Sequence, residues 1–106
     1  MALRRELAET VAMVTGGGSG LGRAISRDLA AHGAHVLVAD IDADGAAETV
    51  SLVQSSGGSA EPIELDVTDR AAVDDVVKRA AADHGERFDL LVNNAGTDRG
   101  DDLVDV

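Results

Sequence analysis

A run of glycines near the start of the chain has the residue types and the spacing that bind a phosphate group. The segment Thr15-Gly16-Gly17-Gly18-Ser19-Gly20-Leu21-Gly22 contains five glycines, follows an apolar run and precedes a helical pattern. Glycines let the backbone turn sharply and approach a pyrophosphate, and the free N–H groups at the positive end of the next helix would face the anion. We interpret the segment as a phosphate loop; a flexible turn is the alternative when the segment is taken alone.

Side chains that could bind other parts of a nucleotide stand at the ends of three later apolar runs. Asp40 closes the first of these runs, Asp66-Val67 closes the second, and Asn93-Asn94-Ala95-Gly96 stands at the end of the third. In an open parallel sheet the ligand lies outside the carboxyl ends of the strands. We therefore expect these residues and the glycine run to line one crevice.

The elements that would position these residues alternate between two types. Apolar, strand-like runs cover residues 11–15, 35–40, 61–66 and 88–93, and amphipathic segments fill the gaps between them. This alternation predicts the order β-α-β-α-β-α-β and a parallel sheet of about four strands. Pro62 predicts an edge position for the third strand, because proline cannot donate a hydrogen bond to a neighbouring strand.

The three amphipathic segments are predicted to be helices. The first stops at Gly33, the second opens near Asp42, and the third runs from Thr68 or Asp69 to Gly85. Their apolar positions are Leu21, Ile25 and Leu29 in the first, Ala46, Val50 and Val53 in the second, and Val73, Val76, Val77 and Ala80 in the third.

Length and composition limit what the chain can be. Its 106 residues predict a single domain, with a lead-in over 1–10, a core over 11–96 and an acidic tail over 97–106. The absence of cysteine excludes disulfides and thiolate metal sites. The formal net charge of −11 argues against nucleic acid and against an anionic membrane surface as partners. Because no apolar stretch reaches signal-peptide or membrane-spanning length, we expect a cytoplasmic location.

Taken together, the motifs resemble those of the short-chain dehydrogenase/reductase family over nearly the whole chain. Thr15-Gly16-x-x-x-Gly20-x-Gly22 is similar to the family's phosphate-loop signature, and Asn93-Asn94-Ala95-Gly96 is similar to its second signature. Asp40 and Asp66-Val67 stand between them, where the family contacts its cofactor. The resemblance implies a Rossmann-like fold, truncated relative to the full family fold, that forms the NAD(H)-binding part of an oxidoreductase. Such enzymes transfer hydride between nicotinamide and a hydroxyl or carbonyl substrate.

The phosphate loop would act through its backbone. Gly16 and Gly20 would allow the tight turn and a close approach to the pyrophosphate, and Gly22 would let the helix lie against the sheet. Ser19 and Leu21 would offer backbone N–H groups to the phosphates, with the Ser19 hydroxyl as a further donor.

By the same resemblance, the later motifs would contact the rest of the cofactor. Asp66 would accept a hydrogen bond from the adenine amino group, beside the Val67 backbone; a helix cap is the alternative for Asp66. The backbone of Asn93 would contact the ribose region, and Ala95 and Gly96 would shape the floor under the nicotinamide. For Asn94, which also belongs to this stretch, the alternative is that it braces the strand.

Asp40 predicts that NAD is preferred over NADP. It lies 18 residues after Gly22, near the offset of about 20 at which an acidic side chain accepts hydrogen bonds from ribose hydroxyls. A 2′-phosphate would meet a like charge there. No lysine or arginine lies in the loop or just beyond Asp40, since Arg23 belongs to the helix. The alternative is that Asp40 or Asp42 caps the next helix.

No metal site is expected from the sequence. The stretch 40–45 matches the first half of a calcium loop, with carboxylates at alternate positions before a glycine, but Ser51 stands where a bidentate Glu should close the loop. His32, His35 and His84 have no metal-ligand spacing, and we expect them at helix ends or on the surface.

The family's catalytic residues have no counterpart in this sequence. In the family, a Ser, a Tyr and a Lys four residues after the Tyr follow the Asn-Asn-Ala-Gly segment. This chain contains no Tyr, and its single lysine, Lys78, stands on the third amphipathic segment. We therefore predict cofactor binding and assign no catalytic residue.

Two further interpretations remain open beside the cofactor-binding part of an NAD-dependent dehydrogenase. The chain could be a stand-alone dinucleotide-binding module, or a non-catalytic remnant that pairs with another chain. The apolar run 88–93 would be an exposed edge strand unless it is covered. We therefore expect self-association or a partner chain at that edge.

Overall fold

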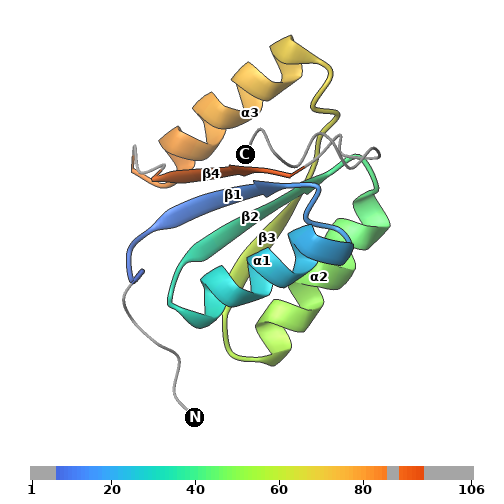
Figure 1. Cartoon of the computed structure of the whole chain (residues 1–106). Helices are drawn as coiled ribbons and strands as arrows, with labels where there is room; N and C mark the ends of the chain where they lie inside the picture. Colours follow the sequence, from blue (N-terminus) through green and yellow to red (C-terminus); the bar gives the residue numbers. More distant parts are fainter. Residues whose placement is uncertain (1–6, 86–88, 95–106) are drawn as a thin grey trace.

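The chain folds as a parallel β-sheet with a helix between each pair of successive strands (Figure 1). The structure is a computed structural model that describes residues 7–85 and 89–94. The elements are β1 (Val11–Thr15), α1 (Gly20–Ala31), β2 (His35–Asp40), α2 (Ala43–Ser55), β3 (Ser59–Glu64), α3 (Arg70–Asp83) and β4 (Leu90–Asn93). The strand order is β3-β2-β1-β4, and every pairing is parallel. The predicted Rossmann-like alternation is confirmed; residue 88, where the fourth strand was expected to begin, lies outside the described residues.

The third strand begins and ends two residues earlier than the sequence predicts. Pairing with β2 starts at Ser59, directly after the turn that follows α2. The N–H of Leu65 still donates to the Asp40 carbonyl at 3.0 Å, so Asp66 lies beyond the strand instead of closing it. The edge position of β3, predicted from Pro62, is confirmed.

The core has two halves, one on each face of the sheet. α1 and α2 cover one face, and α3 covers the other (Figure 1). Side chains alternate between the faces along β2: Val36 and Val38 join the cluster under α1 and α2, whereas Leu37 joins the cluster under α3. The central strands β1 and β2 are therefore buried on both faces, as is usual for parallel sheets.

The inward face of α1 consists of small residues. Gly22, Ser26 and Ala30 are buried, whereas Ile25 and Leu29 of the predicted apolar series only border the core. Leu21, the first of that series, is 57% exposed. Small side chains let α1 lie close to the sheet, and this close approach displaces the larger apolar residues from the contact.

α2 and α3 each follow an aspartate that caps the N-terminus of the helix. Asp42 caps α2 by accepting from the Gly45 N–H at 3.1 Å, and Asp69 caps α3 by accepting from the Ala72 N–H at 3.1 Å. Such caps stabilise a helix by about 1 kcal/mol each. The helix-cap alternative is therefore confirmed for Asp42 and is wrong for Asp40 and for Asp66. Within the described part of the chain, no helix is long and apolar enough to cross a membrane.

We expect Gly22→Ala to destabilise the protein strongly. A Cβ atom at this position would lie 2.0 Å from the Gly16 carbonyl oxygen, so α1 or the loop would have to move. The expected loss is about 3 kcal/mol in the free energy of unfolding, measured by urea denaturation followed by circular dichroism. Gly85→Ala is the matched control, because a Cβ there meets nothing within 4 Å and only the left-handed backbone costs about 1–2 kcal/mol. Equal losses in both variants would contradict the close contact at Gly22.

Candidate functional site

The residues singled out in the sequence lie at one edge of the sheet. Each strand has one of these features at its carboxyl end: β1 the glycine loop, β2 Asp40, β3 Asp66 and β4 Asn94. The chain builds β1, β2 and β3 outward in one direction and then crosses back to place β4 on the other side of β1. Ligands of open parallel sheets lie where the strand order reverses in this way, which here is beside β1.

The glycine loop presents the N-terminus of α1 to this edge. The backbone is left-handed at Gly16 (φ 69°) and at Gly20 (φ 54°). Ser19 is the N-cap, and its hydroxyl makes no capping bond within the described chain. The first turn of α1 carries no acidic side chain. The N–H groups and the positive dipole end of the helix are therefore available to an anion.

Arg23 holds the glycine loop against α2. Its Nη2 donates to the Gly18 carbonyl at 2.6 Å and to Glu48 Oε1 at 2.8 Å, and its Nε donates to Thr49 Oγ1 at 2.9 Å. The buried Thr49 hydroxyl in turn donates to the Gly17 carbonyl at 2.7 Å. The guanidinium is therefore bound to three protein acceptors and shapes the loop from behind.

Asp40 connects the glycine loop to the end of β2. Its Oδ2 accepts from the Gly18 N–H at 2.8 Å, and its Oδ1 accepts from the Asp42 N–H at 2.9 Å. Gly18 has no room for a side chain, because a Cβ there would lie 2.8 Å from Asp40 Oδ2. Each carboxylate oxygen can accept a further hydrogen bond, so Asp40 can hold the loop and still bind a hydroxyl group.

A cavity of about 250 Å³ lies between Asp40 and the segment that follows β3. Asp66 is on its wall, and Asp66 Oδ1 accepts from the Thr68 hydroxyl at 2.7 Å and from the Thr68 N–H at 2.9 Å. The hydroxyl bond first, and then the N–H bond, hold the pKa of Asp66 below its ordinary value of 3.8. Ile41, which is 65% exposed, adds an apolar side chain. The cavity is lined by Gly16, Asp40, Ile41, Leu65, Asp66, Val67 and Thr68.

The end of β4 is tied to the loop after β1 by a hydroxyl group. Thr15 Oγ1 accepts from the Asn94 N–H at 2.9 Å and shares its own proton between the Val92 carbonyl (3.3 Å) and Asn93 Oδ1 (3.2 Å). The Asn94 side chain donates to the Gly16 carbonyl at 3.5 Å. The interpretation of Asn94 as a brace is therefore confirmed.

The structure brings together most of the residues predicted for the site. Gly16, Asp40, Asp66 and Val67 line one cavity. Asn93 Oδ1 accepts a hydrogen bond from Thr15, the residue before the same loop. Gly22 lies close against the Gly16 carbonyl of that loop. Ser19, Gly20 and Leu21 begin the helix beside it. Ala95 and Gly96 lie outside the described residues.

Sequence reasoning missed three residues that shape the loop. The sequence pattern does not distinguish Gly18 from the other four glycines of the loop. It places Arg23 on the helix without indicating a contact with the loop, and it places Thr49 among apolar residues. One signal was available: Thr49 is a hydroxyl residue inside the apolar series of α2. A buried hydroxyl needs a partner, and here the partners are the loop and Arg23.

The stretch that half matches a calcium loop has other functions. Asp40 ends a strand and binds the glycine loop, and Asp42 caps α2. The third carboxylate of the pattern, Asp44, is exposed in the first turn of that helix. The strand-to-helix geometry therefore differs from the helix-to-loop geometry of a calcium site.

Comparison with known proteins agrees with this geometry. A family model described as short chain dehydrogenase matches residues 10–105. L-2,3-butanediol dehydrogenase from Corynebacterium glutamicum is 46% identical over 98 residues, which are 91% of this chain and 38% of that protein. The short-chain dehydrogenase/reductase homolog YusS from Bacillus subtilis is 42% identical over 90 residues, which are 84% of this chain and 82% of that protein. The chain thus spans less than half of the first relative and most of the second.

Solved structures show the same arrangement of elements. The hydroxysteroid dehydrogenase from Escherichia coli superposes with a TM-score of 0.80 at 38% identity, over 85% of this chain and 38% of that one. A metagenomic short-chain oxidoreductase in complex with NADP superposes with a TM-score of 0.81 at 36% identity, over 85% of this chain and 40% of that one. On this match of sequence and structure, the chain belongs to the short-chain dehydrogenase family, whose members bind a nicotinamide dinucleotide.

Proposed function

We propose that this chain is the NAD(H)-binding part of an oxidoreductase that moves hydride between nicotinamide and a hydroxyl or carbonyl group. The observation that carries the proposal is the meeting of the glycine loop with two carboxylates around one cavity at the carboxyl edge of the sheet. The loop offers N–H groups to a diphosphate, and the cavity offers carboxylate acceptors and apolar side chains to an adenosine. Membership of the family supports the same reading. A cytoplasmic location remains a prediction from the sequence.

The cofactor would lie across the switch point beside β1. Its diphosphate would be bound by the N–H groups around Ser19 and Leu21, and its adenine by Asp66 and the backbone of Val67. The low pKa of Asp66 keeps it an acceptor, which is what an amino group requires. The contacts assigned to Asn93, Ala95 and Gly96 on the nicotinamide side are predictions of the family resemblance.

The charges around the cavity favour NAD over NADP. Asp40 and Asp66 both line it, and none of the described residues that line it is a lysine or an arginine. Arg23, which follows the glycine loop, is bound to Gly18, Thr49 and Glu48. A 2′-phosphate near Asp40 would therefore meet a negative charge without a compensating cation.

The hydride-transfer chemistry would need residues that this sequence does not contain. It has no tyrosine to act as the family's proton donor. Under the proposal, this chain binds and orients the cofactor, and the acid/base residue is supplied from outside these 106 residues.

A second candidate function is a dinucleotide-binding module that works without turnover of its own. It is favoured by the similarity to YusS, of which this chain covers 82%. The outer edge of β4 is consistent with this candidate. Within the described chain β4 pairs with β1 alone, and its side chains Leu90 and Leu91 are exposed. A module of this kind would cover that edge with a second chain.

We expect the chain to bind NADH and to bind NADPH more weakly. In Asp40→Asn, the ratio of the NADPH to the NADH dissociation constant should fall at least about fivefold, because a charge pair near 4 Å is worth about 1–4 kcal/mol. Intrinsic fluorescence of the reduced nicotinamide gives both constants. The ratio isolates the charge effect, since loosening of the loop would weaken the binding of both cofactors by the same factor.

The control for this variant is Asp44→Asn. It removes the same charge from the exposed first turn of α2, and the ratio should stay within about twofold of wild type because solvent screens an exposed charge. No binding of NADH by the wild-type chain at millimolar concentration would sink the proposed function.

Thr68→Val should raise the pKa of Asp66 toward 3.8, because the hydroxyl bond is the larger cause of the lowered value. The lowered folded-state pKa means that Asp66 contributes stability that is present above 3.8 and is lost as the pH falls through the folded value. Carboxyl carbon chemical shifts followed through an acid titration measure the change. Thr68→Ser keeps the hydroxyl and should keep the low pKa; a wild-type value in Thr68→Val would contradict the assignment.

The exposed edge at β4 should make the isolated chain self-associate. Leu91, which is 51% exposed, is the test position, because a charged residue on an edge strand prevents pairing with a second chain. Leu91→Lys should shift the sedimentation coefficient toward that of a monomer. Ala82→Lys adds the same charge to an exposed position of α3 and should leave the association unchanged. A wild-type chain that sediments as a monomer at all concentrations would disprove self-association.

A further inference from the structure

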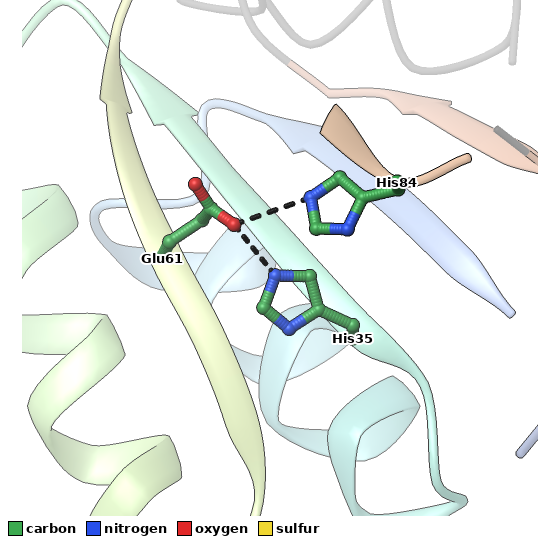
Figure 2. Close-up of side chains that lie close together, drawn as sticks. All are labelled: His35, Glu61 and His84. Atoms are coloured by element: carbon green, nitrogen blue, oxygen red, sulfur yellow. Dashed lines mark hydrogen bonds and ion pairs between the residues drawn. The ribbon is translucent and has the colours of Figure 1, made fainter. Parts of the chain in front are cut away.

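Two histidines and a glutamate meet at the end of the sheet opposite the glycine loop. His35 begins β2, Glu61 lies on β3, and His84 follows the last turn of α3 (Figure 2). Glu61 Oε2 lies 2.7 Å from His35 Nε2 and 3.3 Å from His84 Nε2. The two imidazole rings are 4.8 Å apart between centroids. Three residues from three separate elements thus point one ligand atom each at a common centre.

We propose that this cluster binds a divalent transition-metal ion, with Zn²⁺ as the preferred ion. Two imidazole nitrogens and one carboxylate oxygen form a ligand set typical of zinc, and a water molecule completes the tetrahedron. Zinc bonds of about 2.0–2.1 Å place neighbouring ligand atoms about 3.3 Å apart. The His84–Glu61 distance of 3.3 Å already has this value. All three ligand atoms lie within 4.8 Å of one another. Metal binding therefore requires only small side-chain movements, one of which lengthens the His35–Glu61 distance from 2.7 Å.

Ser59 orients the first imidazole for metal binding. Its Oγ lies 2.5 Å from His35 Nδ1, the ring nitrogen that faces away from the cluster. A hydroxyl can donate or accept. Without metal, the serine donates to Nδ1 while Nε2–H bonds to Glu61; with metal, Nδ1–H donates to the serine and Nε2 is free to ligate. Such partners of a ligating histidine fix its tautomer and raise metal affinity.

The cluster is accessible and lies in an acidic protein. The side chains of His35, Glu61 and His84 are 25%, 48% and 23% exposed, so an ion can enter and keep a water ligand. Glu61 and His84 also line a hollow of about 300 Å³ between β3 and α3. Arg79, the cation on that wall, is paired with Asp75 at 3.1 Å. The net charge of −11 raises the local concentration of cations.

This site is separate from the proposed cofactor site. His35 and Asp40 are the first and last residues of β2, which at about 3.3 Å per residue puts them about 17 Å apart. A metal bound by His35, Glu61 and His84 would join β2 and β3 to the end of α3. The site would stabilise the fold, and it takes no part in hydride transfer.

The test is a titration of the metal-free chain of 106 residues with Zn²⁺ alone, followed by calorimetry. We expect one ion per chain and a dissociation constant on the order of 1 µM, weaker than that of four-ligand structural sites. His84→Gln and Glu61→Gln should each weaken binding more than tenfold. Both substitutions introduce an amide that can form hydrogen bonds in the metal-free cluster, so we expect the fold to be retained. Ser59→Ala should weaken binding about tenfold. His32→Gln is the matched control, because His32 ends α1 outside the cluster, and binding should be unchanged.

A second measurement does not depend on the variants. In the wild-type chain, addition of Zn²⁺ should shift the imidazole proton signals of His35 and His84 in NMR spectra and leave those of His32 in place. Absence of saturable binding below about 1 mM, an equal loss of affinity in His32→Gln, or one ion shared by two chains would each overturn the proposal. In that case the cluster is a hydrogen-bonded contact between β2, β3 and α3 only.

Discussion

The close contact between Gly22 and the Gly16 carbonyl is the constraint on which the rest of the site depends. Because nothing larger than hydrogen fits between them, α1 begins almost in contact with the loop that leads into it. This contact aims the positive end of α1 at the carboxyl edge of β1. It also sets the register of the helix: Arg23 donates to the Gly18 carbonyl of the loop, and the Ser26 hydroxyl donates to the Gly22 carbonyl at 2.9 Å. Loop shape, helix position and anion site therefore follow from one small residue.

An acidic chain can bind an acidic cofactor because the binding groups are backbone amides. The net charge of −11 repels a diphosphate at long range, but screening limits that repulsion to about 8 Å in physiological salt. At contact, the dipole of α1 and the N–H groups beside Ser19 supply the attraction. Arg23, the first residue after the glycine loop, binds the Gly18 carbonyl and so fixes the loop. Under the proposed function, the carboxylate of Asp40 would discriminate between ribose substituents without opposing the diphosphate contacts directly.

The sequence predicts the order of the elements because periodicity and glycine placement are local properties. β1 and β2 have the predicted bounds, since both are short apolar runs between clear turn residues. β3 was misplaced by two residues, because its start is fixed by pairing with β2 and not by its own alternation. The sequence alone also leaves both Asp40 and Asp42 as candidates for the helix cap, because either carboxylate could reach N–H groups. The tertiary position of Gly18 decides the outcome: its N–H binds Asp40, and Asp42 caps the helix. The contact between Arg23 and Thr49 is tertiary: the hydroxyl of Thr49 within an apolar series indicates that it needs a polar partner, but no local pattern identifies Arg23 as that partner.

The same limit explains why the proposed metal site has no signal in the sequence and why it need not affect cofactor binding. His35, Glu61 and His84 are separated along the chain by 26 and 23 residues, and spacing rules apply to ligands within one turn or helix. Parallel pairing places Glu61 on the strand beside His35, and the length of α3 brings His84 to both. β2 is buried and paired on both sides, so its two ends cannot move independently. A ligand shifts a second site only when it prefers one of two conformations. A metal at the first residue of β2 would therefore stabilise the strand that carries Asp40 without changing the affinity of the ribose site proposed there.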